Sequence, residues 1–163
     1  FMVHIKNRQL TEGTWKLIQD SEDSRDGSYL LLPLSEWIDA YGEGSLAPSN
    51  VGAWIDVNFE LMDLPTIPNV LGIHFEQFTD GRGYSLARLV RERFEFQGDL
   101  IAIGDILRDQ LRDLERCGFN VFVMRPDQDV SESLKAFDEF DVSYQKVSSA
   151  YKIVSNPIKI GAD

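Results

Sequence analysis

The chain has 163 residues, of which 43% are hydrophobic and 26% are charged, as expected of a folded globular protein. Its formal net charge of −11 argues against nucleic acid or an anionic membrane as the main partner, because both require clustered positive charge. A lone cysteine, Cys117, leaves no internal disulfide framework, and no apolar run reaches the roughly 20 residues of a membrane-spanning helix. These features favour a cytoplasmic protein.

The N-terminal residues predict a β-hairpin. Its strands are expected at Val3–Gln9 and Thr14–Gln19, on either side of a turn at Leu10–Gly13. The polar stretch Asp20–Ser28 is typical of a surface loop. Residues 1–28 are therefore interpreted as a hairpin followed by a linker.

Apolar strands then alternate with helices. Leu30–Pro33 is a short apolar run, and strands are predicted at Val51–Val57, Val70–Phe75, Leu100–Ile103, Phe119–Met124 and Val142–Lys146. Helices are predicted at Ser35–Tyr41, Ser85–Phe96, Asp105–Cys117 and Asp129–Phe140. This alternation predicts an α/β domain over residues 29–147 with a mainly parallel sheet of βαβ units, either open and flavodoxin-like or curved into a partial barrel. Residues 148–163 show no periodic pattern and are expected to form a loosely held extension.

The loop after the strand Val70–Phe75 is the first candidate binding site, because ligands of such sheets bind at the carboxyl edge of the strands. Two glycines flank Arg82 there, and backbone N–H groups at a helix start attract anions. The hypothesis is an oxyanion or phosphate site with Asp80 as a catalytic or orienting carboxylate. Its binding residues would be Thr79, Gly81, Arg82, Gly83 and Ser85. The alternative is a tight turn at Asp80-Gly81, with Ser85 capping the helix.

The turn Gly104–Gln110 is the second candidate. Asp105 follows its strand after one glycine, so it is either a helix N-cap or a second catalytic carboxylate at the same edge. Arg88, Arg108 and Arg125 are placed to reach this crevice and join the predicted binding residues. Four other arginines fall on outward helical faces and are expected to form solvated ion pairs: Arg91, Arg93, Arg112 and Arg116.

The remaining motifs are weak. His74 lies within a buried strand and is interpreted as a core residue, and two distant histidines with one cysteine do not suggest a metal site. Neither the dinucleotide-binding glycine pattern nor the phosphate-binding P-loop is present.

Several segments resemble a known family. They are Phe78–Ser85, Ala87-Arg88-Leu89, Gly104–Leu111 and Arg116–Phe119. The sequence is similar to the uncharacterised bacterial family called domain of unknown function nine hundred and thirty-four. Members are commonly labelled as oxidoreductases linked to sulfite reduction, and the resemblance implies that context. It brings no established catalytic residues.

Two functions follow as hypotheses, and the sequence does not decide whether the protein is an enzyme. The first is an accessory protein or oxidoreductase of assimilatory sulfite or sulfate reduction that binds an oxyanion or phosphorylated ligand. Electron transfer would then need a borrowed cofactor such as flavin. The alternative is a noncatalytic acidic protein that docks on a sulfite- or sulfate-reducing enzyme. An isomerase on a partial barrel ranks last, because its carboxylates lack metal ligands.

Overall fold

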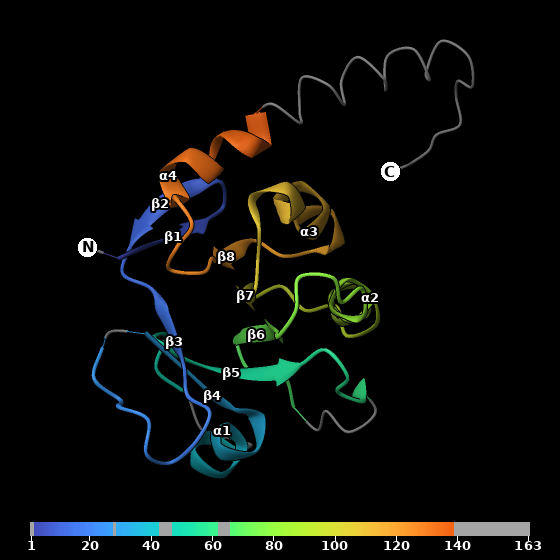
Figure 1. Cartoon of the computed structure of the whole chain (residues 1–163). Helices are drawn as coiled ribbons and strands as arrows, with labels where there is room; N and C mark the ends of the chain where they lie inside the picture. The colour runs from blue at the N-terminus through green and yellow to red at the C-terminus, as the bar shows by residue number, and fades with distance from the viewer. Residues whose placement is uncertain (1, 28, 43–46, 62–65, 139–163) are drawn as a thin grey trace.

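The computed structural model describes residues 2–27, 29–42, 47–61 and 66–138. Its centre is an eight-stranded sheet in the order β2-β1-β8-β7-β6-β5-β4-β3 (Figure 1). The strands are β1 Val3–Lys6, β2 Gln9–Glu12, β3 Trp15–Leu17, β4 Tyr29–Pro33, β5 Val51–Asp56, β6 Val70–Phe75, β7 Asp99–Gly104 and β8 Val121–Val123. The helices are α1 Leu34–Tyr41, α2 Arg82–Arg93, the 3₁₀ helix η2 Arg108–Gln110, α3 Leu111–Cys117 and α4 Val130–Ser133.

The sheet is mostly parallel. Strands β3 to β8 pair in chain order and all run in the same direction. Strand β1 runs the opposite way and pairs antiparallel with β2 on one side and β8 on the other. A mixed α/β fold with an N-terminal hairpin was predicted and is confirmed. The flavodoxin-like order, in which the strand sequence reverses, is not seen. The sheet instead curls into a half-barrel, with the helices along its outer side (Figure 1).

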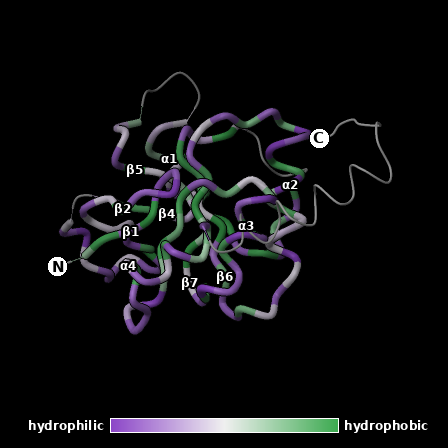
Figure 2. The backbone as a smooth tube through the Cα atoms, turned by 90° about the horizontal axis from the view of Figure 1, so that it is seen from above, coloured by the Kyte–Doolittle hydropathy of each residue, from purple (hydrophilic) through white to green (hydrophobic). Residues whose placement is uncertain are grey.

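Strand alternation divides the apolar residues between two faces. Along β6, Leu71, Ile73 and Phe75 point to the convex face, where they pack with buried residues of the helices. Val70 points to the concave face and packs with residues such as Ile101 and Val121. Both faces are therefore apolar, and the hydrophobic stretches gather in the strands at the centre of the molecule (Figure 2).

The hairpin is confirmed, but its boundaries were predicted wrongly. Its turn is at Asn7-Arg8, which have positive φ of 52° and 65°, as a two-residue hairpin turn requires. The turn contains no glycine and therefore lacks the usual sequence signal of a two-residue hairpin turn. Strand β1 therefore pairs with Gln9–Glu12, and Trp15–Leu17 is a separate strand that pairs with β4 at the opposite edge of the sheet.

A single extended segment, Gln9–Leu17, contains both edge strands. A flat sheet of this size would place its outer strands about 34 Å apart. The chain from the end of β2 at Glu12 to the start of β3 at Trp15 spans at most about 11 Å. The sheet must therefore curl until its edges approach. Gly13 makes the join with a φ of 86°, and its N–H donates to the Met2 carbonyl at 2.8 Å.

Helix α2 starts earlier than predicted. Its first residue is Arg82, so Ser85 lies inside the first turn and does not cap the helix. Leu86 and Val90 are buried as predicted, but Leu89 is 40% exposed. The face that contacts the sheet therefore consists of Gly83, Leu86, Ala87 and Val90.

Two of the arginines predicted to be solvated are not. Arg91 donates to the carbonyls of Phe96, Gly98 and Gly118 at 2.8–2.9 Å, and so joins the end of α2 to the loops before β7 and β8. Arg112 is 7% exposed and pairs with Glu115 at 2.8 Å. A helical wheel shows which side of a helix is away from the sheet, but not which loops cover it.

The prediction for residues 148–163 lies outside the described residues, as does the strand at Val142–Lys146 and the end of the helix Asp129–Phe140. The described part of that last helix begins as predicted, because the Asp129 carboxylate accepts a hydrogen bond from the Glu132 N–H at 3.0 Å. Within the described ranges, no helix is both long and apolar enough to cross a membrane.

Candidate functional site

The corners that follow β6, β7 and β8 lie side by side at the carboxyl edge of the sheet. Parallel pairing sets this arrangement, since Phe75 at the end of β6 is opposite Gly104 at the end of β7. Ile103 is in turn opposite Val123 of β8. The Asp105 N–H also donates to the Phe75 carbonyl at 2.8 Å, so the first two corners are joined through the backbone.

Asp105 connects all three corners through its side chain. One carboxylate oxygen accepts the Phe78 N–H at 3.0 Å from the first corner. The other accepts Nη1 of Arg125 at 2.6 Å from the third. The N-cap alternative for Asp105 is wrong, because the helical segment begins only at Arg108. Asp105 therefore connects two loops that are distant in sequence. Such a contact cannot be predicted from the residues around a helix start.

Gln110 makes a second connection between the first two corners. Its side-chain oxygen accepts the Leu107 N–H at 3.0 Å, within its own turn. Its amide nitrogen donates to the Phe78 carbonyl at 2.6 Å and to the Tyr84 hydroxyl at 3.0 Å. Together Asp105 and Gln110 hold both backbone groups of Phe78, so this exposed loop has a fixed position.

Arg82 and Asp80 form a local pair on the first corner. The Asp80 carboxylate accepts the Arg82 N–H at 3.0 Å and two guanidinium nitrogens at 3.0 and 2.7 Å. These hydrogen bonds from Arg82 lower the pKa of Asp80. The Arg82 side chain is 63% exposed. Thr79, Gly81 and Ser85 are exposed around this pair.

Gly83, in contrast, is buried against the core. A Cβ at this position would lie 2.3 Å from the Phe75 ring and 3.1 Å from Val57. Close packing of α2 on the sheet therefore accounts for this glycine, whereas the sequence had suggested close approach to an anion.

The three other predicted arginines lie apart from that pair. Arg88 donates to the Cys117 sulfur at 3.3 Å, where α2 and α3 meet. Arg108 is partly buried at the start of η2. Arg125 binds Asp105 and also Asp127 in a bidentate pair at 3.0 and 2.8 Å, and these carboxylates raise its pKa. The structure thus unites Asp105 and Arg125, whereas Arg82 pairs with Asp80 and Arg88 contacts Cys117.

Residues 55–153 match the family described as bacterial protein of unknown function (DUF934). The chain belongs to this family. The matched region contains all three corners, together with α2, α3 and α4. No curated protein and no solved structure matches the chain.

The DUF934 chain has one further candidate residue, His74, which its sequence pattern placed in the core. His74 lies between Ile73 and Phe75 of the convex core, so alternation places it on the concave face. There it meets the Trp54 ring edge-on at 5.5 Å, and its register partner is Asp56. Burial lowers the pKa of His74, against the opposing effect of the Glu76 and Asp56 charges. Strict alternation in the strand was the signal that could have identified it.

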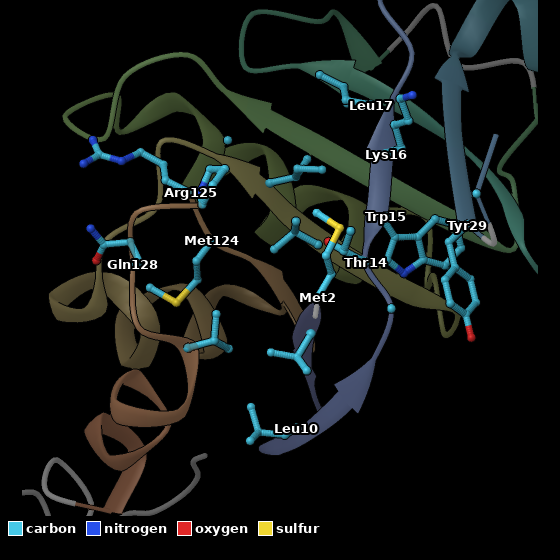
Figure 3. Close-up of a pocket in the computed structure, with 18 of the residues that line it drawn as sticks. Met2, Leu10, Thr14, Trp15, Lys16, Leu17, Tyr29, Met124, Arg125 and Gln128 are labelled. Carbon is cyan, nitrogen blue, oxygen red and sulfur yellow. The ribbon is translucent and has the colours of Figure 1, made fainter. Parts of the chain in front are cut away.

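The same DUF934 structure contains a large groove beside the third corner. It lies between the hairpin, β3 and the carboxyl ends of β7 and β8, and has a volume of about 1220 Å³ (Figure 3). Arg125 and Gln128 belong to its rim, and Trp15 and Tyr29 lie together on its far side (Figure 3). Within the described residues, no group of three or more histidine, cysteine, aspartate or glutamate side chains could hold a metal ion.

Proposed function

We propose that this DUF934 protein is a cytoplasmic accessory protein of assimilatory sulfite or sulfate reduction, which docks on a sulfite- or sulfate-reducing enzyme without catalysing a reaction. The sulfur context rests on the family resemblance. The docking role rests on the charge of the carboxyl edge.

One observation supports the docking role: at the carboxyl edge, Arg82 and Arg125 each form ion pairs with carboxylates of that same edge. Arg125 is held by Asp105 and Asp127, and Arg82 by Asp80. Two more carboxylates of this edge, those of Glu76 and Asp109, are exposed and form no ion pair among the described contacts. A rigid edge with excess negative charge steers a protein towards a basic surface on its partner.

The test is direct association with the purified reductase. The unaltered protein is expected to co-elute with the enzyme at low salt and to separate as the salt concentration rises, because salt screens exposed charges. The double substitution Glu76→Lys and Asp109→Lys should weaken binding about tenfold. The double substitution Glu92→Lys and Glu95→Lys is the matched control, because it reverses two exposed charges near the opposite end of α2. Separate elution of the two proteins at low salt would rule out docking.

A second candidate is oxyanion binding by Arg82, and one observation favours it. Asp80 is held by the Arg82 N–H and guanidinium in the way these groups would hold an oxyanion. A ligand would displace that carboxylate. Calorimetric titration with sulfite, sulfate, adenylylated sulfate and flavin mononucleotide tests this candidate. Binding of one of them should be lost in Arg82→Ala and kept in Arg93→Ala, which changes an exposed arginine at the other end of the helix.

A further inference from the structure

The groove beside the hairpin, which we call the hairpin groove, is an apolar surface at the opening of the half-barrel. One wall is the extended segment Gln9–Leu17, which contributes Leu10, Trp15 and Leu17. The opposite wall comes from the ends of β7 and β8, with Ile103 and Val123. Figure 3 shows the extended segment crossing the groove, with Leu10 at one end and Lys16 and Leu17 at the other.

Exposed apolar side chains lie at the edge of this groove. Met2 is 62% exposed and Leu10 is 42% exposed. Apolar surface exposed next to an apolar concavity is typical of a protein interaction site. The volume of about 1220 Å³ is larger than the 300–1,000 Å³ or so of most small-molecule sites, which also enclose their ligand. The groove therefore suits a segment of another protein better than a small molecule.

Charge indicates the kind of segment. The positive rim residue Arg125 is already neutralised by Asp105 and Asp127. Among the described residues of the lining, Asp26 and Asp129 add negative charge, and Lys16 is the one cation besides Arg125. The formal charge of −11 on each chain also opposes a second copy of the protein as the occupant.

We propose that the hairpin groove receives a segment of the docking partner whose apolar side chains are flanked by lysine or arginine. This inference rests on the proposed function, because it concerns the same partner. The apolar side chains fill the space between Leu10 and Val123, and the basic residues lie near Asp26 and Asp129. The groove adjoins the acidic corners through Arg125, so one partner covers both surfaces.

The first experiment measures the affinity of the full chain for the reductase at several salt concentrations. Leu10→Ser should weaken binding about tenfold without changing the salt dependence, because it removes apolar contact and no charge. Met2→Ser should act in the same direction. Leu89→Ser is the matched control, since Leu89 is 40% exposed on α2 and outside the groove. If Leu10→Ser binds as tightly as the unaltered protein, the groove inference is overturned while docking stands.

A second experiment does not depend on the reductase. A fluorescent peptide of alternating leucine and lysine is titrated with the full chain, alongside a peptide in which glutamate replaces lysine. The lysine peptide should bind the unaltered protein and Leu89→Ser, and bind Leu10→Ser about tenfold more weakly. No binding of the lysine peptide would overturn the inference whatever the reductase does. Sedimentation as a dimer that Leu10→Ser dissociates would also overturn it, because a second copy would then fill the groove.

Discussion

The Arg125 guanidinium donates to the Asp105 carboxylate at 2.6 Å, across the space between the second and third corners of the carboxyl edge. The other oxygen of Asp105 accepts the Phe78 N–H at 3.0 Å. One carboxylate thus fixes a backbone group on one side and a charged side chain on the other. Removing its charge weakens both contacts at once.

Asp105→Asn should therefore destabilise the fold by about 1–2 kcal/mol. The loss is small because the Arg125 side chain is 39% exposed, and water partly replaces the lost ion pair. Urea unfolding followed by circular dichroism measures the change. Asp109→Asn removes the same charge from an exposed position in the same turn and should alter the free energy of unfolding much less. Equal effects of the two substitutions would show that Asp105 does not connect the corners.

Gly83→Ala should destabilise the protein by about 1–3 kcal/mol. The new Cβ would lie 2.3 Å from the Phe75 ring, and this ring is itself 1% exposed and cannot move outward. Gly81→Ala provides the control, because a Cβ there has no atom within 4 Å and the backbone φ is an ordinary −72°. Thermal unfolding of the two variants compares them directly. A Gly83→Ala protein as stable as Gly81→Ala would contradict the packing explanation of this glycine.

The central fold could be predicted because its strands carry their own signal. Val70–Phe75 is apolar apart from His74 and was placed with the bounds that the structure has. The turn of the hairpin could not be placed, because Asn7 and Arg8 adopt positive φ without glycine and the chain then continues directly into a strand of the other edge. Strand order depends on contacts between distant residues, and periodicity contains no information about them.

The candidate site was predicted in part for the same reason. Parallel strands bring their carboxyl ends together, so Asp105 and Arg125 could be placed near one another from their positions after consecutive strands. Loop conformation determines which carboxylate pairs with each arginine, and the sequence does not show it. Arg82, for example, pairs with the nearby Asp80. His74 was interpreted as a core residue, and the structure shows it half-buried on the concave face, where it meets the Trp54 ring edge-on.

Arg91→Lys should cost about 2–4 kcal/mol of stability. The flat guanidinium donates at once to the carbonyls of Phe96, Gly98 and Gly118, and a lysine ammonium cannot reach all three in this geometry. The carbonyls left without donors then lose their hydrogen bonds in a partly buried site. Arg93→Lys, on the exposed side of the same helix, should be nearly neutral. Urea unfolding of both variants tests the difference, and equal stability of the two would contradict the role assigned to Arg91.

His74 should make the stability of the protein depend on pH near neutrality. Burial beside Trp54 lowers its pKa in the folded state below the ordinary value of 6.5, so the folded protein holds fewer protons on this ring than the unfolded chain does. The stability that this residue provides is therefore complete above pH 6.5, and it is lost as the pH falls from 6.5 towards the folded pKa. In His74→Gln this part of the loss should disappear. Urea unfolding at pH 8 and at pH 5.5 gives the change in the free energy of unfolding for each protein. If that change is the same with and without the histidine, the ring is not held neutral by its buried position on the concave face.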